Sequence, residues 1–301
     1  VRVLCARGVP VRAVVRDEAR ARALLAGCAA QFQRGDAADP ESATAACRDA
    51  AVVYHAVNLP YSEWERLPGL TENIIAAARA AGARLLFPGN VYLYGLPQAA
   101  RVSETHPYAP HTRKGRLRRR LECRLLEAHF KGEVPVAIAR FPDYYGPNVT
   151  NPLIRPMFCN ALAGKPIPWP GDPNLPHEFV LIDDAARAMV EIALRPEAFG
   201  RIYNIPGPAA VTGHQWAQLL AEAAGKPLGL RRLRPWVLPL AGLFDRQAWE
   251  FYEMLYLWQA PVLLLEDGAY TTHVGPLPQT PYPEGIAATM AWWRGRLHAT
   301  R

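Results

Sequence analysis

The stretch TENIIAAARAAGARLLF, residues 71–87, sets the class of fold. Its first eleven residues have the amphipathic pattern of a helix, and Gly82 follows where a glycine commonly ends one. RLLF at 84–87 has the composition of a buried strand, and AVVYH at 51–55 has the same composition on the other side of the helix. A strand, a helix and a strand in this order predict a parallel βαβ unit.

The same alternation extends in both directions from this unit. Short apolar runs at 11–15 and 134–140 predict further strands, and so does Gln31–Gln33, which leads to a turn at Gly35 and Asp36; residues 18–26 predict a helix. Another helix opens with Asp39 as its N-cap and Pro40 at its first position. We therefore predict an α/β protein with a Rossmann-like, doubly wound parallel sheet. In such sheets ligands bind beyond the carboxyl ends of the strands.

The later part of the chain has a different composition. From about residue 147 the proline and glycine content rises and the strand–helix alternation weakens, which predicts a smaller C-terminal region that caps the substrate. We predict a dinucleotide-binding domain at 1–147 plus about 179–208. The substrate-binding region is expected at about 148–178 and 209–301.

The composition narrows the class of protein. The chain has 301 residues and a formal charge of +7, and no apolar run reaches the roughly 18–20 residues that a membrane span needs. Its five cysteines are scattered and never form a CxxC pair, so we expect neither disulfides nor a metal site, and we expect a cytoplasmic protein. Residues 113–124 are rich in arginine. They are interpreted as a solvated helix face, with a phosphate-binding surface as the alternative and nucleic acid not expected, since no aromatic residues are interleaved.

Several segments, in this order, resemble the extended short-chain dehydrogenase/reductase family, in particular its NAD-dependent epimerase/dehydratase group. The resemblance covers nearly the whole chain. It implies an enzyme that moves hydride between NAD or NADP and a carbonyl or alcohol carbon. The expected substrate is a small molecule such as a sugar derivative. The resemblance also implies a homodimer. The alternative is a catalytically inactive NAD(P)-binding sensor or scaffold. The segments are GDAADPES (35–42), YHAV (54–57), NVYLYG (90–95), RFPDYYGP (140–147), FVLIDDAARAMV (179–190), YNIPGP (203–208) and PYPEGIAATMAWWR (281–294).

One part of the family pattern is missing. Members carry a Gly-x-x-Gly-x-x-Gly turn after their first strand, where backbone N–H groups receive the cofactor pyrophosphate. The 301 residues contain no such turn. VRVLCARG at 1–8 resembles the end of the helix that follows it, so we expect a truncated start that lacks the first strand, with a natural protein without that strand as the alternative.

The remaining cofactor contacts are implied position by position. Arg16 follows the second strand of the family pattern, where an arginine can pair with a 2′-phosphate; this slightly favours NADP over NAD, with an exposed structural arginine as the alternative. Asp36 and Ala37 match the pair beside the adenine ring. The other cofactor-binding residues that the resemblance implies are His55, Ala56, Val57, Phe141, Pro142 and Arg118.

The catalytic positions depart from the family pattern. No Tyr-x-x-x-Lys occurs in the chain, and both flanks of the motif place Lys114 at the tyrosine position and Arg118 at the lysine position. Asn90 occupies the Ser/Thr position. An ammonium group is a poor proton donor to an alkoxide unless burial or nearby cations make it more acidic.

Other side chains offer substitute acid–base groups. Tyr92, two residues after Asn90, is expected on the same side of the strand and is the best substitute phenol, with a packing role as the alternative. Any of Asp143, Tyr144, Tyr145 and the pair His177 and Glu178 could also serve.

Overall fold

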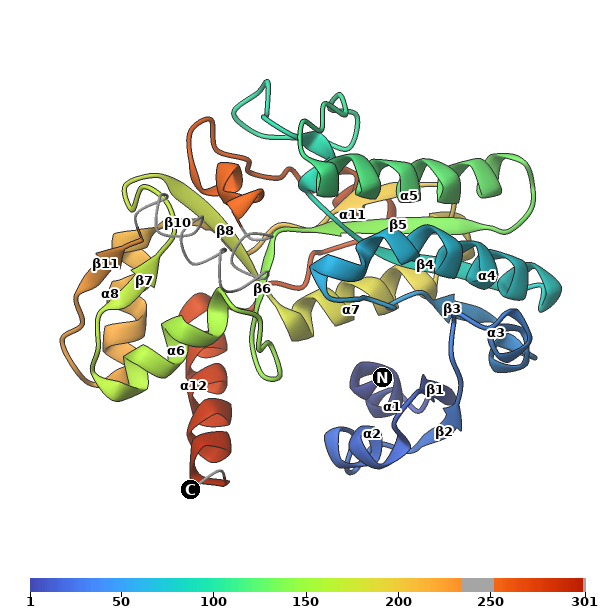
Figure 1. The fold of residues 1–301 in the computed structure, drawn as a ribbon, viewed down its shortest axis with the longest axis horizontal. Helices are drawn as coiled ribbons and strands as arrows, with labels where there is room; N and C mark the ends of the chain where they lie inside the picture. The colour runs from blue at the N-terminus through green and yellow to red at the C-terminus, as the bar shows by residue number, and fades with distance from the viewer. Residues whose placement is uncertain (234–251, 300–301) are drawn as a thin grey trace. The chain divides into compact units, whose positions relative to one another are not determined.

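A computed structural model describes residues 1–233 and 252–299, and these form two compact units (Figure 1). Unit 1 comprises Val1–Gly89, Leu117–Ala139 and Ala186–Tyr203; unit 2 comprises the described residues of Asn90–Arg116, Arg140–Ala185 and Asn204–Arg301. Residues 90–116, 140–147, 179–185 and 204–208 group with unit 2, and the predicted division of binding roles stays a prediction. Residues 234–251 of the predicted substrate-binding region lie outside the described residues.

The strands of unit 1 form two sheets. The first is a parallel pair in which Val11 lies opposite Ala30, and the second has the order β3-β4-β5-β9 with β3 parallel to β4. Among the described residues no ladder joins the two sheets. The predicted Rossmann-like α/β fold is confirmed. The strands are β1 Val11–Val15, β2 Ala30–Arg34, β3 Val52–Tyr54, β4 Arg84–Asn90, β5 Val136–Phe141 and β9 Ile202–Asn204, of which β4, β5 and β9 end in unit 2.

Polar side chains cap two helices of unit 1, whose bounds differ slightly from those predicted: α2 ends at Leu24, before the predicted 26, and α4 begins at Leu67, before the predicted 71. The Asp17 carboxylate accepts a hydrogen bond from Arg20 N at 3.0 Å, and Asp39 caps the next helix in the same way through Glu41 N. Gly82 has a φ of +63° just after a helix, as predicted. The helices are α1 Arg2–Ala6, α2 Glu18–Leu24, α3 Pro40–Cys47, α4 Leu67–Ala80, α5 Arg113–Phe130 and α7 Ile182–Ala193, with the 3₁₀ turns η1 Tyr61–Arg66 and η3 Pro196–Ala198; α5 and α7 begin in unit 2.

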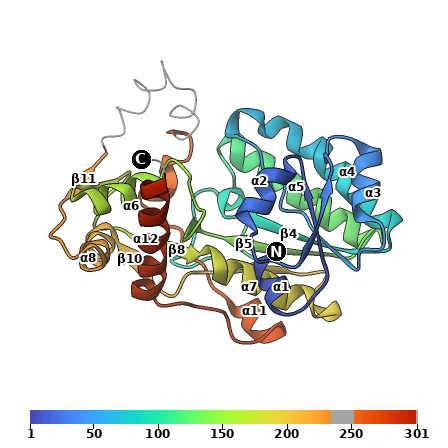
Figure 2. The same cartoon turned by 90° about the horizontal axis from the view of Figure 1, so that it is seen from below.

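Unit 2 contains short strands and an aromatic core. β6 lies parallel to β8, β10 lies antiparallel to the other edge of β8, and β7 pairs with β11. Helices α6, α8 and α12 lie side by side (Figure 2). The elements are η2 Tyr92–Tyr94, β6 Asp143–Tyr145, α6 Ile154–Ala163, β7 Ile167–Trp169, β8 Pro176–Leu181, β10 Ala210–Thr212, α8 Gly213–Ala224, β11 Leu230–Arg232, η4 Leu255–Trp258, α11 Gly268–His273 and α12 Tyr282–Ala299.

The buried side chains explain why each unit is compact. In unit 1 the sheet and its helices bury aliphatic residues such as Ile75, Leu85 and Val136. In unit 2 the core is rich in aromatic rings, and Phe179 stacks on Trp216 with 4.2 Å between ring centroids. Within the described ranges, no helix is long and apolar enough to cross a membrane.

Candidate functional site

The loop after β1 carries two charged residues, Arg16 and Asp17, and only the side chain of Asp17 forms a hydrogen bond within the described residues. The Asp17 carboxylate is occupied as the N-cap of α2. Arg16 is exposed, and none of the described residues forms a hydrogen bond or ion pair with its guanidinium. Arg16 is therefore available to an anionic ligand at the carboxyl end of β1.

The loop after β2 is held by its own polar groups. Asp36 accepts a hydrogen bond from Ala38 N at 2.9 Å, and its own N–H donates to Ser42 Oγ. The carbonyl of Ala37 accepts from Asn73 Nδ2 on α4 at 2.9 Å. These bonds fix the backbone at the carboxyl end of β2, where the resemblance predicts an adenine contact.

His55 lies at the end of β3 and is buried, with 2% of its surface exposed. Its Nε2 atom lies 3.0 Å from Thr71 Oγ1, and Nδ1 has no hydrogen-bond partner among the described residues. Burial lowers the pKa of His55 to about 3, and the Arg118 charge acts in the same direction. His55 is thus a neutral imidazole, whereas the next two residues, Ala56 and Val57, are exposed at the strand end.

Arg118 is also buried within unit 1. Its guanidinium carbon lies 4.3 Å from the ring centroid of Trp64 and 6.0 Å from that of Phe87. Trp64 in turn donates through Nε1 to the carbonyl of Leu59 at 2.9 Å. This role of Trp64 was not predicted, because one tryptophan in a loop carries no motif.

Asn90 and Tyr92 belong to unit 2, at and beyond the end of β4. Asn90 is the last residue of β4, and its Oδ1 accepts from Tyr92 N at 3.1 Å, which leaves Nδ2 without an acceptor among the described residues. Tyr92 begins η2, so the prediction that it shares a strand face with Asn90 is wrong: the strand ends before Tyr92. Gly95 ends η2 with a φ of +68°, and a Cβ there would lie 2.0 Å from the carbonyl oxygen of Ala109.

Lys114, in the first turn of α5, is only 3% exposed and is paired with Glu253. The Nζ atom lies 2.8 Å from Oε2 of Glu253, and Lys114 N donates to Oε1 at 3.0 Å. Burial alone would raise the pKa of Glu253, but these hydrogen bonds outweigh it and hold that pKa below its ordinary value. No local signal pointed to Glu253, since 139 residues separate the two partners.

A short segment, residues 253–258, contacts several of the candidate groups in unit 2. Besides the contact of Glu253 with Lys114, the hydroxyl of Tyr256 donates to the carbonyl of Tyr92 at 3.4 Å. Trp258, the last residue of η4, stacks on His177 with 3.7 Å between ring centroids. We call residues 253–258 the bracing segment.

His177 and Asp143 form a pair between neighbouring strands of unit 2. The Nε2 atom of His177 on β8 lies 2.9 Å from Oδ2 of Asp143 on β6. The side chains are 12% and 24% exposed, so both are partly accessible to solvent. Phe141 and Pro142, which the resemblance places at the cofactor, immediately precede Asp143, and Phe141 is buried with its ring centroid 5.4 Å from that of Tyr144.

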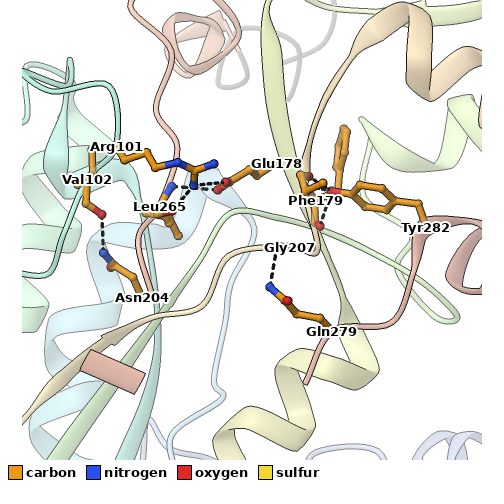
Figure 3. Close-up of polar contacts among 10 residues, drawn as sticks. Arg101, Val102, Glu178, Phe179, Asn204, Gly207, Leu265, Gln279 and Tyr282 are labelled. Carbon is orange, nitrogen blue, oxygen red and sulfur yellow. Dashed lines mark hydrogen bonds and ion pairs between the residues drawn. The ribbon is translucent and has the colours of Figure 1, made fainter. Parts of the chain in front are cut away.

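Glu178, next to His177, is buried in a polar cluster that links three segments (Figure 3). Its carboxylate accepts from Leu265 N at 3.0 Å and lies 3.6 Å from Arg101 Nη1. Burial raises the pKa of Glu178 to about 7, although the Leu265 N–H and Arg101 act in the opposite direction. Glu178 thus holds the chain near Leu265, which gives its carboxylate a structural role.

The arginine-rich helix is partly neutralised within unit 1. Arg124 donates to Glu72 at 2.8 Å and to Glu133 at 2.9 Å. This arginine is therefore not part of a free basic row. Among the described residues, no group of three or more His, Cys, Asp or Glu side chains is arranged to hold a metal ion.

The residues of unit 1 fit the adenosine end of a dinucleotide. Arg16 presents an unpaired guanidinium, and the loops after β2 and β3 carry the exposed Asp36, Ala56 and Val57. His55 Nδ1 is a buried polar atom without a partner among the described residues, at the same strand end as Ala56. The 301 residues contain no glycine-rich phosphate turn, so the fit concerns the adenosine end alone.

Comparison with known proteins points to one family. A dTDP-glucose 4,6-dehydratase of Actinoplanes sp. is 24% identical over 73% of this chain and 62% of its own length, so the chain spans less than two thirds of that relative. The solved structure of DesIV, a dTDP-glucose 4,6-dehydratase from Streptomyces venezuelae with NAD and TYD bound, has a TM-score of 0.76 at 19% identity, covering 96% of this chain and 89% of DesIV.

A second solved structure is a UDP-glucuronic acid 4-epimerase mutant from Bacillus cereus in complex with UDP-4-deoxy-4-fluoro-glucuronic acid and NAD. It has a TM-score of 0.79 at 17% identity, covering 98% of this chain and 94% of the epimerase. The sequence profile of the NAD dependent epimerase/dehydratase family matches residues 1–206. Because this match extends over more than half of its length, the chain belongs to the NAD dependent epimerase/dehydratase family.

Proposed function

We propose that this protein carries out NAD-dependent epimerisation or dehydration of a nucleotide sugar. The family match over residues 1–206 is the observation that carries the proposal. It is supported by relatives and solved structures that are dTDP-glucose 4,6-dehydratases or a UDP-glucuronic acid 4-epimerase. Because these proteins act on or bind nucleotide sugars with NAD, the proposed first step is the oxidation of a secondary alcohol of the sugar.

Unit 1 carries the proposed dinucleotide contacts. Arg16 and Asp36 would bind the adenosine end, and the backbone at Ala56 and Val57 would pass beside the cofactor. When bound, the nicotinamide supplies the hydride acceptor. The proposed dinucleotide-binding domain comprises residues 1–147 and about 179–208. The proposed substrate-binding region comprises about 148–178 and 209–301.

Unit 2 carries the proposed substrate contacts. Asn90 Nδ2 would donate to the oxygen of the reacting carbonyl, since no described residue accepts from it. Lys114 occupies the family's tyrosine position, and its ammonium would stabilise negative charge on the same oxygen. The proposed role of Arg118 is to maintain positive charge near the cofactor ribose, and that of Tyr92 is to serve as a phenol near Asn90.

The choice between NAD and NADP depends on Arg16. The solved relatives named above hold NAD. An unpaired guanidinium after β1 favours a 2′-phosphate, so we propose that NADP also binds, through Arg16. The cytoplasmic location, the homodimer and the absence of nucleic-acid binding stay predictions; light scattering in solution tests the homodimer.

A catalytically inactive NAD(P)-binding protein is the second candidate, and one observation favours it. The residue at the family's acid–base position, Lys114, is 3% exposed and its ammonium is paired with Glu253. A proton donor held in this way is poorly placed to serve a substrate unless another group does that work.

The test separates binding from turnover. Binding of NAD⁺ and NADP⁺ is measured by calorimetry, and dTDP-glucose and UDP-glucuronic acid labelled with deuterium at C4 are then incubated with the protein and NAD⁺. Because epimerisation and dehydration return the hydride to the sugar, detection of a labelled epimer or of a labelled dehydrated sugar by mass spectrometry supports the enzyme. Cofactor binding without conversion of either sugar supports the inactive protein, and the absence of cofactor binding contradicts both.

A further inference from the structure

We propose that His177, oriented by Asp143, is the acid–base residue of this protein, in place of the tyrosine that the family uses. The proposal rests on the proposed function. By sequence alone, His177 is one of several candidate acid–base residues. Its contacts within unit 2 distinguish it from the others.

The hydrogen bond between the two side chains decides the protonation of the ring. The Asp143 carboxylate can only accept, so the Nε2 atom, 2.9 Å away, carries the proton when the imidazole is neutral. The lone pair is then on Nδ1, which has no hydrogen-bond partner among the described residues. A carboxylate on one nitrogen and a free lone pair on the other is the arrangement that a general base requires.

Aromatic rings hold the imidazole in this orientation. Trp258 stacks on it with 3.7 Å between centroids and 21° between planes, and the ring centroid of Phe179 lies 4.9 Å away. The edge of Trp169 approaches with 6.3 Å between centroids. Since the ring is held on several sides, the direction of Nδ1 is set before a substrate binds, which lowers the cost of proton transfer.

The alternatives are less suitable. Lys114 is buried and paired with Glu253, and Tyr145 is fully buried in the aromatic core, where burial raises its pKa well above the ordinary value. His177 is 12% exposed and reachable. The bracing segment contacts both groups, since Glu253 pairs with Lys114 and Trp258 stacks on His177.

The proposed step is a balanced oxidation of a secondary alcohol. When bound, NAD⁺ would supply the acceptor for the hydrogen of the sugar C–H bond together with both electrons of that bond. The O–H bond breaks, its proton moves to Nδ1 of His177, and the C–O bond becomes C=O. Asp143, a positioning residue, stabilises the resulting imidazolium through Nε2–H. In an epimerisation, where the same carbonyl is reduced again, His177 would return the proton to the oxygen.

The test compares H177Q, D143N and the control H214Q, in which the replaced histidine is exposed on α8 of the same unit. With NAD⁺ and dTDP-glucose, we expect H177Q to lower kcat by about 100-fold or more with KM changed less than about two-fold. We expect the pH profile of kcat in H177Q and in D143N to differ from that of the wild type, because one variant lacks the imidazole and the other lacks the carboxylate that stabilises the imidazolium. H214Q behaves as wild type.

A second readout does not depend on turnover. Diethyl pyrocarbonate modifies accessible neutral imidazoles, and peptide mass spectrometry locates the product. We expect dTDP-glucose to protect His177 and not His214. If H177Q does not fold, as judged by circular dichroism, the pH profile of D143N and the protection of His177 in the wild type decide the question.

The outcomes separate this proposal from the proposed function. A wild type that transfers hydride while H177Q keeps its kcat and pH profile overturns the role of His177 alone. Loss of thermal stability in H177Q and D143N with an unchanged pH profile assigns the pair a structural role and overturns it as well. A wild type that transfers no hydride from any nucleotide sugar overturns the proposed function and this inference together.

Discussion

The ammonium of Lys114 lies 2.8 Å from Oε2 of Glu253, and this contact joins the start of α5 to the bracing segment. The side chain of Lys114 is almost fully buried, whereas that of Glu253 is 24% exposed. A buried ammonium requires a counter-charge, and the Glu253 carboxylate supplies one. The pair therefore explains how the ammonium of Lys114 can be buried at the start of α5.

Removing the carboxylate charge of Glu253 should destabilise unit 2. E253Q keeps the shape of the side chain but takes a negative charge away from the buried Lys114 ammonium, and we expect a loss of about 2 kcal/mol in the free energy of unfolding at pH 7. E266Q, at an exposed glutamate of the same unit, is the control and should change the free energy by less than about 0.5 kcal/mol. Urea unfolding measures both, and equal values for the two variants would contradict the prediction.

The same pair predicts a pH dependence. The pKa of Glu253 is lower in the folded protein than its ordinary value, so the stabilisation is complete above that ordinary value and is lost as the pH falls through the folded pKa. The free energy of unfolding of the wild type should therefore approach that of E253Q in acid. Urea unfolding of both proteins between pH 7 and pH 3 measures the difference between the two free energies, which should become smaller as the pH decreases.

His55 should make unit 1 sensitive to acid. Its folded pKa of about 3 is below the ordinary 6.5, so the unfolded chain takes up a proton that the folded chain does not. Stability is unaffected by this residue above pH 6.5 and falls by up to about 1.4 kcal/mol per pH unit between 6.5 and 3. H55Q, which keeps a polar group near Thr71, should have a shallower dependence in urea unfolding between pH 7 and pH 5. A slope identical to wild type would show that His55 is already protonated in the folded protein.

Glu178 should have the opposite effect in unit 2. Its folded pKa of about 7 is above the ordinary 4.5, so its contribution to stability is present in full below pH 4.5 and is lost as the pH rises through 7. E178Q keeps an oxygen that accepts from Leu265 N and removes the charge. We expect E178Q to be more stable than wild type at pH 8 and similar at pH 4.5, as measured by thermal unfolding. A variant that is less stable at both pH values would indicate that the Arg101 ion pair outweighs burial.

Arg16 should distinguish the two nicotinamide cofactors. Its guanidinium has no partner among the described residues, so R16A removes no contact that they make. We expect R16A to weaken NADP⁺ binding by about 10-fold, the equivalent of about 1.4 kcal/mol, and to leave NAD⁺ binding unchanged. R20A, at an exposed arginine of the following helix, is the control. If calorimetry gives the same ratio of NADP⁺ to NAD⁺ affinity for wild type and R16A, Arg16 does not select between the two cofactors.

The elements of unit 1 follow from local signals. Apolar periodicity predicts β1, and Asp17, Asp39 and Gly82 mark helix ends through bonds to their own neighbours in the chain. Such signals act over a few residues, so they can be recognised without the fold. The family resemblance is likewise a property of segments in order, and the profile match over residues 1–206 confirmed it.

The pairing of distant side chains could not be predicted in this way. The residues that pair are far apart in the chain: Trp64 with Arg118, Glu253 with Lys114, and Asp143 with His177. Even the nearby Tyr92 was misplaced, because β4 ends at Asn90 and η2 turns the chain.

Patterns along the chain thus established the class of fold, the strand ends and the departure from the family's tyrosine–lysine motif. Which charges neutralise each other, and which imidazole keeps a free nitrogen, became visible only in the folded molecule. The cause is the range of the interactions: capping and periodicity depend on neighbours along the chain, whereas burial and charge pairing depend on residues that folding brings together.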